Sequence, residues 1–475
     1  MKNALKFYID GAWVAPSGTA RLPVVDPCTE EPFAEVALGQ ADDVDRAVAA
    51  AKRAFPSFSR TLPSERIALI RRILEQYLLR YDEIASTISR EIGAPRALAH
   101  NWHAGLGKRH LEQLLRTGET FAWQRPQGTT LVNHEPVGVV ALITPWNWPI
   151  NQIACKVAPA IAAGCTMVLK PSEVSPLNAV LFAEVLDAAG VPPGVFNLVQ
   201  GEGASVGAAL ARHADVDMVS ITGSTRAGVE VAMLAAPTVK RVHQELGGKS
   251  ANLLLDDAHF EAAVTAGVNA CFGNSGQSCN APTRMLVPAA RYEEAVELAR
   301  RAAQAHRVGP PDDAQATMGP VVSALQHARV QRLIGIGIEE GARLVAGGLG
   351  RPDGLARGYY VKPTVFADVT PAMTIAREEV FGPVLAMMAY GDEDEAIALA
   401  NDTPYGLAAY VQSGDIERAR RVALRLRAGS VYLNHPAWDA AAPFGGYKQS
   451  GNGREYGDWG LEAFLEVKAV VGYGN

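Results

Sequence analysis

Short apolar runs alternate with helical patterns along most of this chain, and the alternation forms two successive series. The runs of the first series are bounded by Gly, Pro or polar residues, as buried parallel strands are. They lie at 137–143, 166–169, 195–199 and 218–221, with helix candidates at 178–189 and 207–212. Because strands and helices alternate, this series predicts a doubly wound α/β domain.

A second series begins after Glu245. Its strand candidates lie at 250–255, 284–287, 341–345, 383–389 and 430–433, and its helix candidates at 292–306, 325–340, 393–400 and 416–426. Three further helices are predicted near the start of the chain, at 42–55, 64–81 and 81–93. The C-terminal half therefore predicts a second α/β domain.

Two β-prone segments fall outside both series. Residues 129–135 are polar and resemble a projecting hairpin, and residues 464–471 form a short strand candidate near the end of the chain. Strands outside a core are often sheet edges that pair with another chain. We therefore expect both segments to contact a partner subunit.

Composition excludes several classes of function. The chain has 475 residues, 48% of them hydrophobic, and a formal net charge of −6. An acidic chain without a clustered basic run is not predicted to bind nucleic acid or anionic membranes. No stretch approaches the roughly 20 apolar residues of a membrane span, and residues 1–10 lack the apolar core of a secretory signal, so we expect a cytoplasmic protein.

The cysteines predict neither disulfides nor a zinc site. They are odd in number, far apart and without a C-x-x-C pair: Cys28, Cys155, Cys165, Cys271 and Cys279. A lone cysteine in a reducing compartment is usually a small buried hydrophobe. A catalytic role therefore has to be argued from the surroundings of one particular cysteine.

Residues 203–207, GASVG, match the G-x-S-x-G pattern of serine hydrolases. They follow a strand candidate and precede a helix candidate, and Asp215 and His243 come later, in the hydrolase order. A serine esterase using Ser205 is therefore one alternative. We favour a Gly-rich turn near a phosphate, because five-residue matches arise often in a chain with 45 glycines.

Cys279 is the strongest candidate nucleophile. It ends the small, polar segment FGNSGQSC at 272–279, a type of loop that leaves the sulfur accessible. A reactive thiolate also needs local positive potential. Three other motifs lie at the carboxyl ends of predicted strands, where α/β folds bind ligands: PWNWP at 145–149, LKPSE at 169–173 and QELGGKS at 244–250.

These motifs, together with TGST at 222–225, EEVFGP at 378–383, NDTPYGL at 401–407 and PFGGYK at 443–448, resemble the NAD(P)-dependent aldehyde dehydrogenase superfamily. The resemblance implies an α/β fold with a Rossmann-type NAD(P)-binding domain at 1–116 and 138–246 and an α/β catalytic domain at 247–447. It also implies a small β oligomerisation element, a hairpin at 117–137 and a tail at 448–475, that joins subunits into a homodimer or homotetramer.

The resemblance assigns the catalytic roles to three residues. Cys279 would attack the aldehyde, and the Asn147 amide with the Cys279 N–H would bind the oxyanion. Glu245 would activate the water that hydrolyses the thioester, and because the CoA-acylating branch lacks this glutamate, we expect a free carboxylic acid as product. The resemblance also places Ser205 in the cofactor-side turn, which argues against the esterase.

The implied cofactor residues come from several motifs: Trp146, Lys170, Glu173, Gly203, Gly207, Gly223, Ser224, Leu246, Glu379 and Phe381. Lys170 and Glu173 would bind the adenosine ribose. Since a carboxylate there repels a 2′-phosphate, NAD is expected, with NADP possible. No metal is expected.

The substrate tunnel is also assigned by resemblance. Trp148 and Trp438 would flank it, and Cys155 and Gly273 occupy positions where many relatives carry aromatic residues. Two tryptophans with two small residues predict a roomy apolar tunnel. The segment NAPTRML at 280–286 resembles a subgroup that acts on bulky semialdehydes. We therefore expect a bulky aromatic or long-chain aldehyde or semialdehyde as substrate.

Overall fold

The structure is a computed structural model that describes residues 2–474. The N-terminal half of the chain forms the first of two large sheets. Its seven strands have the order β11-β10-β7-β8-β9-β1-β2. They are β1 (Phe7–Ile9), β2 (Ala12–Val14), β7 (Val139–Ile143), β8 (Thr166–Lys170), β9 (Phe196–Leu198), β10 (Met218–Thr222) and β11 (Arg241–Glu245). The strands from β11 to β9 run parallel, whereas β1 and β2 are added antiparallel at one edge. The carboxyl ends of β7, β8, β10 and β11 therefore lie at one edge of the sheet.

Helices cover both faces of this sheet. They are α1 (Ala41–Phe58), α2 (Pro63–Leu79), α3 (Tyr81–Ile92), α4 (Arg96–Leu98), α5 (Gly105–Thr120), α6 (Pro149–Ala163), α7 (Leu177–Ala188), α8 (Ala208–Arg212) and α9 (Thr225–Ala235). One apolar core lies between the sheet and α2, α3, α5, α6 and α7, and another lies under α1 on the opposite face. All residues of α6 are buried, so its sequence lacks the polar stripe by which a surface helix is recognised.

The second sheet also has seven strands, in the order β14-β15-β16-β13-β12-β17-β18. They are β12 (Ala251–Leu254), β13 (Arg284–Pro288), β14 (Arg343–Ala346), β15 (Thr364–Ala367), β16 (Val384–Tyr390), β17 (Ala408–Gln412) and β18 (Ser430–Leu433). The helices of this half are α10 (Phe260–Phe272), α11 (Tyr292–Gln304), α12 (Ala324–Glu339), α13 (Thr374–Arg377), α14 (Glu393–Asn401) and α15 (Ile416–Ala423). Apart from β14 the strands are parallel, which confirms an α/β arrangement in both halves.

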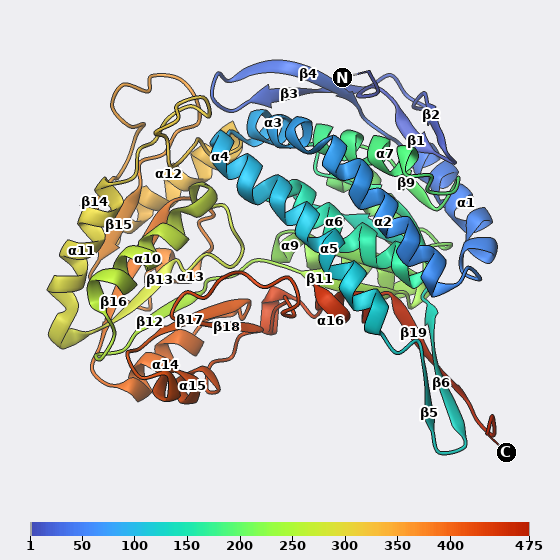
Figure 1. Ribbon diagram of the computed structural model, residues 1–475. Coiled ribbons are helices and arrows are strands. Elements are labelled where there is room, and N and C mark those ends of the chain that lie inside the picture. The colour runs from blue at the N-terminus through green and yellow to red at the C-terminus, as the bar shows by residue number, and fades with distance from the viewer. Residues whose placement is uncertain (1, 475) are drawn as a thin grey trace.

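The two β-prone segments that lie outside both series, 129–135 and 464–471, pair with each other. The hairpin β5 (Gln124–Gln127) and β6 (Thr130–Pro136) projects from the first half, and β19 (Leu465–Val470) runs antiparallel to β6 (Figure 1). The short helix α16 (Gly457–Glu462) leads the chain back to this small sheet. A separate two-stranded sheet, β3 (Arg21–Asp26) with β4 (Glu31–Ala37), lies near the N-terminus.

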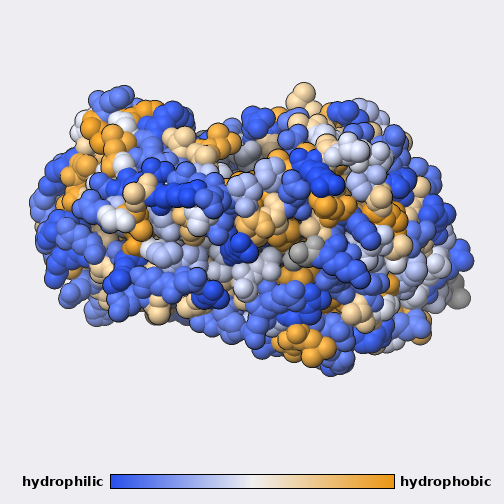
Figure 2. Space-filling model, turned by 90° about the horizontal axis from the view of Figure 1, so that it is seen from above, coloured by the Kyte–Doolittle hydropathy of each residue, from blue (hydrophilic) through white to orange (hydrophobic). Residues whose placement is uncertain are grey.

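Most predicted elements are present, within a few residues of their predicted bounds. The sequence patterns do not predict β1 to β4, β11, β15 and β17, nor helices α4, α5, α6, α9, α10, α13 and α16. Within residues 2–474, no helix is both long and apolar enough to cross a membrane. On the face shown in Figure 2, hydrophobic residues form separate patches among hydrophilic ones.

Candidate active site

The loop before Cys279 is held in an unusual backbone conformation. It begins at the end of α10, and both Asn274 (φ 53°) and Ser275 (φ 57°) are left-handed. The Asn274 amide donates to the backbone oxygen of Asn147 (2.8 Å), and the Gln277 side chain accepts from the N–H of Val322 (2.9 Å). Left-handed backbone at non-glycine residues persists only where the surroundings enforce it. These hydrogen bonds therefore fix where the sulfur lies.

Asn147 lies directly against this loop. It follows β7, its side chain is 4% exposed, and its amide nitrogen donates to the backbone oxygen of Gln277 (3.0 Å). Asn147 and Cys279 also line the same pocket. An amide donor and a thiol in one pocket match the pairing expected for a nucleophile and its oxyanion donor.

That pocket contains many of the predicted cofactor residues. It is lined by Pro145, Trp146, Asn147, Thr222, Gly223, Ser224, Leu246, Gly247, Cys279, Gln326, Arg329, Glu379 and Phe381. Residues from β7, β10 and β11 meet residues from the second half of the chain there. The pocket therefore opens at the carboxyl ends of parallel strands, where dinucleotides bind in such folds.

The residues of this pocket fit a dinucleotide. Glu379 accepts a hydrogen bond from the N–H of Gly248 (3.0 Å), and burial raises the pKa of its carboxyl to about 7. A Cβ on Gly247 would lie 2.4 Å from the Glu379 carboxylate, so only glycine leaves this approach open. The ring of Trp146 meets that of Phe381 edge-on (5.4 Å between centroids). An apolar wall with one carboxylate is suited to a ribose and a flat ring.

Glu245 ends β11 and is 1% exposed. Neither of its carboxylate oxygens has a hydrogen-bond partner among the described residues. Burial, and then the negative charge of Glu455, raise the pKa of this carboxyl well above its ordinary value. A buried carboxylate without partners is costly to keep in a structural role, whereas a raised pKa is what a general base needs.

Glu455 and Lys156 form a buried ion pair beside Glu245. Lys156 also donates to the hydroxyl of Ser220 (3.0 Å), and Glu455 accepts from the thiol of Cys155 (3.5 Å). Lys156 and the Arg454 charge oppose the rise in the pKa of Glu245. The pKa of the candidate base is therefore raised mainly by burial, and the two members of this ion pair shift it in opposite directions.

Cys279 is half-buried, and three carboxyl groups act on its thiol. Burial raises the pKa of the thiol above its ordinary value, and the carboxylates of Glu379, Glu245 and Glu455 raise it further. The backbone N–H of Asn280 lowers the pKa of the thiol. The contributions that raise the pKa outweigh this one.

Cys279 also contacts an apolar cluster. Its buried members are Cys155, Leu407, Phe444 and Tyr456, and Trp438 packs against them. The rings of Phe444 and Tyr456 are stacked (5.1 Å), and Trp438 meets Tyr456 at 5.9 Å. The predicted substrate residues Cys155 and Trp438 are thus brought together beside the thiol.

The model of the aldehyde dehydrogenase family matches residues 13–470 of this chain. The chain belongs to the aldehyde dehydrogenase family. It is 54% identical to a 3-succinoylsemialdehyde-pyridine dehydrogenase of a Pseudomonas species, over 100% of this chain and 99% of the relative. Enzymes of this family oxidise aldehydes to carboxylic acids with NAD(P).

Solved aldehyde dehydrogenases have the same fold. A mutant of aldehyde dehydrogenase C from Pseudomonas syringae, in complex with NAD+ and octanal, is 55% identical, with a TM-score of 0.99 over 99% of this chain and 97% of that one. An aldehyde dehydrogenase of Mycobacterium tuberculosis in complex with NAD+ is 42% identical, with a TM-score of 0.96 over 98% of each chain.

The remaining residues predicted from the family resemblance lie around the pocket. Lys170 ends β8 and pairs with Glu173 (2.8 Å). Gly203 and Gly207 bound a turn before α8, and a Cβ on Gly207 would lie 3.9 Å from Ile143 at the end of β7. These four residues do not line the pocket itself.

The hydrolase alternative finds no support in the geometry. The Ser205 hydroxyl donates only to the backbone oxygen of Glu202 (3.3 Å). His243 is buried and contacts the hydroxyl of Ser220 and the backbone oxygen of Arg454 instead, while Asp215 pairs with Lys52 on the surface. Ser205, His243 and Asp215 therefore form no triad.

Several site residues were not predicted from the sequence. Gln326 and Arg329 of α12 reach the pocket, and Arg329 donates to the backbone oxygen of Glu379 (2.8 Å). His103 stacks on Trp148 (4.2 Å), whose indole donates to the hydroxyl of Ser278 (2.9 Å). Gln326, Arg329 and His103 belong to none of the motifs found in the sequence, so only a signal of long-range contact identifies them.

Proposed function

We propose that this enzyme oxidises bulky aromatic or long-chain aldehydes with NAD, using Cys279 as nucleophile and Glu245 as base. Two observations carry the proposal: Cys279 and Asn147 share one pocket, and the buried Glu245 carboxylate has no hydrogen-bond partner in the part of the chain that the structure describes. A carboxylate of this kind can activate water, which favours hydrolysis of the thioester over transfer of its acyl group to another thiol.

The reaction proceeds in two parts. The Cys279 thiolate forms a bond to the carbonyl carbon, and the oxyanion is stabilised by the Asn147 amide and the Cys279 N–H. Bound NAD supplies the acceptor for the hydride that this carbon loses, which leaves a thioester on Cys279. Glu245 then takes a proton from water, the hydroxide adds to the thioester, and the carbon–sulfur bond breaks to release the acid.

NAD is the proposed cofactor, with NADP as the weaker alternative. The support is the Lys170–Glu173 pair at the end of β8, where the half-exposed carboxylate is available to a ribose hydroxyl but repels a 2′-phosphate. Two solved relatives are complexes with NAD+. Pocket residues Trp146, Ser224, Leu246, Glu379 and Phe381 would hold the rest of the cofactor.

The substrate proposal rests on the apolar cluster next to Cys279. Trp438, Tyr456 and Phe444 supply flat apolar walls, whereas Cys155 leaves room between them. One relative is named for a pyridine-bearing semialdehyde, and another was solved with octanal. Trp148, which lies against Ser278, would form a further wall.

We further propose the domain division and assembly predicted from the sequence. The proposed division is 1–116 with 138–246 for NAD binding, 247–447 for catalysis, and 117–137 with 448–475 for oligomerisation. The three-stranded sheet of β5, β6 and β19 has an exposed strand at its β5 edge, which suits pairing within a homodimer or homotetramer. The cytoplasm is the proposed location.

A screen of aldehydes with NAD and with NADP tests the proposal. NADH formation is followed for a series from acetaldehyde to octanal and for aromatic aldehydes, and kcat/KM should be highest for the large ones. Cys279→Ala should abolish the activity, whereas Ser205→Ala should retain it. A series that favours acetaldehyde contradicts the substrate proposal, and loss of activity only in Ser205→Ala contradicts the mechanism.

A further inference from the structure

We propose that Arg109 binds a carboxylate at the far end of the aldehyde's carbon chain, so that ω-oxo acids are favoured substrates. The inference rests on the proposed function, because it concerns the chain of a long aldehyde whose carbonyl reacts at Cys279. It adds an anion-binding residue to a substrate site that otherwise consists of apolar walls.

Arg109 lies between two tryptophans. It belongs to α5 and is half-buried, and its guanidinium carbon is 5.1 Å from the ring centre of Trp102 and 5.9 Å from that of Trp438. Both distances fall within the range of cation–π contact. Stacking of this kind orients the planar guanidinium and leaves its edge, where the N–H donors are, free to bind a carboxylate.

Arg109 has no carboxylate partner among residues 2–474. Two neighbours on α5 do have side-chain acceptors, since Lys108 pairs with the Glu112 carboxylate (3.6 Å) and Arg116 donates to the Gln113 amide oxygen (2.9 Å). A guanidinium carries five N–H donors that match the two oxygens of a carboxylate. An arginine fixed by stacking but unpaired is therefore prepared to receive an anion.

Arg109 and Cys279 lie against the same apolar cluster. Trp438, which Arg109 overlies, packs on the same cluster as Cys279. The next residue, His110, also meets Trp438 (5.5 Å), but burial lowers the pKa of its imidazole to about 4, so it is neutral at physiological pH. Arg109 is thus the cation that faces this side of the cluster.

The two ends of the cluster differ in charge. Near the sulfur, the Glu455 carboxylate is paired with Lys156, and burial raises the pKa values of Glu245 and Glu379, whereas the opposite side faces Arg109. A carboxylate tail is attracted to the Arg109 side. An ω-oxo acid is therefore oriented with its aldehyde toward Cys279, while an uncharged aldehyde gains nothing from this field.

The test compares an ω-oxo acid of octanal's chain length with its methyl ester in the full enzyme with NAD. Wild type should prefer the acid in kcat/KM. In Arg109→Gln the acid-to-ester ratio should fall about tenfold, mainly through KM, which corresponds to about 1.4 kcal/mol. Arg109→Lys should recover part of the ratio, because it keeps the charge but not the planar fork. Arg116→Gln, on the same helix, should keep the wild-type ratio.

Two outcomes overturn the inference: an acid-to-ester ratio that Arg109→Gln leaves in place, and a ratio that Arg116→Gln lowers equally. Failure of the proposed function is recognised separately, because it would leave octanal and both derivatives unoxidised by wild type. In that case the ω-hydroxy acid and its ester are titrated without NAD, with tryptophan fluorescence as readout. Equal affinities for the two in wild type then overturn the role of Arg109.

Discussion

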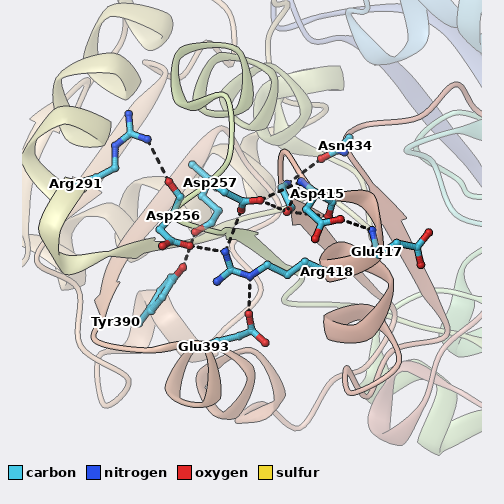
Figure 3. Close-up of polar contacts among 11 residues, drawn as sticks. Asp256, Asp257, Arg291, Tyr390, Glu393, Asp415, Glu417, Arg418 and Asn434 are labelled. Carbon is cyan, nitrogen blue, oxygen red and sulfur yellow. Dashed lines mark hydrogen bonds and ion pairs between the residues drawn. The ribbon is translucent and has the colours of Figure 1, made fainter.

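Two clusters of charged residues, one on the surface and one at the active site, satisfy their carboxylates very differently. In the surface cluster, Arg418 of α15 binds Glu393 (2.8 Å) and Asp256 (2.6 Å) (Figure 3). Asp257 accepts from the hydroxyl of Ser413 (2.7 Å) and from the N–H of Asp415 (3.0 Å). Each of these carboxylates has a donor, and most remain in contact with water.

The active-site cluster is buried and incompletely paired. Lys156 binds Glu455, but residues 2–474 offer no donor to either oxygen of the neighbouring Glu245. Burial alone would raise the pKa of Glu455, but the Lys156 and His243 charges hold this pKa below its ordinary value. The pKa of Glu245, in contrast, is raised. Two adjacent carboxyls thus have separated pKa values, which is the usual arrangement for acid–base chemistry.

The difference between the two clusters shows how a charged residue of this molecule can be interpreted from its hydrogen-bond partners and burial. A satisfied cluster fixes one element to another and contributes modestly to stability. A buried carboxylate without partners lowers stability, so its presence at the active site indicates a chemical role. The predictions below test this distinction.

The largest effect is expected for Glu245→Gln. Removal of a general base should lower steady-state turnover by about 10²–10⁴-fold, because the thioester is no longer hydrolysed efficiently. A burst of NADH equal to the number of active sites should precede the slow phase, and mass spectrometry should detect the acyl group on Cys279. Turnover at the wild-type rate would remove Glu245 from the role of base.

Lys156→Met should strongly destabilise the fold. It leaves Glu455 buried without its cation, which typically lowers the free energy of unfolding by about 3–5 kcal/mol. Denaturant unfolding measures the loss, and the double variant Lys156→Met/Glu455→Leu should recover most of it, since no buried charge is left. A double variant as unstable as the single one would show that packing, rather than charge, sets the effect.

Stability should depend on pH through Glu245. Its pKa is raised on folding from the ordinary value of 4.5, so the folded protein holds this proton to higher pH than the unfolded chain does. The contribution of the neutral carboxyl is complete below about 4.5, and it is lost as pH rises toward the folded pKa, by up to about 1.4 kcal/mol per pH unit. Glu245→Gln should therefore become progressively more stable than wild type from pH 5 to 8. Parallel stability curves for the two proteins would contradict the assigned pKa shift.

The smallest effect is expected for Arg418→Gln. The partly exposed ion pairs that it removes are each worth about 0.2–1 kcal/mol, and salt screens them. The free energy of unfolding should fall only slightly, less so at high salt, with kcat/KM unchanged. A loss as large as that of Lys156→Met would contradict the comparison between the clusters.

The sequence predicts those strands and helices that have a recognisable local pattern of apolar residues. The parallel strands are apolar runs, so β7, β8 and β13 were found within a few residues. Helix α6 was missed because it is buried all round and has no amphipathic period, and β15 is only four residues long. Propensity does not separate such short buried segments from one another.

The catalytic motifs were recognisable because each is contiguous in the chain. The Lys156–Glu455 pair was not, since its members are 299 positions apart and neither lies in a motif that demands the other. The charge around Cys279 depends on where three distant glutamates converge, so the sequence of its loop alone does not predict it. The role proposed for Arg109 likewise depends on its two tryptophan neighbours, which its local sequence does not predict.

The position of Glu455 and Tyr456 has a consequence for biosynthesis. These residues complete the surroundings of Glu245 and Cys279, yet they follow nearly all of the chain that forms the two large sheets. During translation, N-terminal parts fold first, so Lys156 has no partner until the segment that carries Glu455 has left the ribosome. A chain that terminates before Glu455 therefore contains the Cys279 thiol but lacks the ion pair beside Glu245, and its unpaired Lys156 opposes completion of the core.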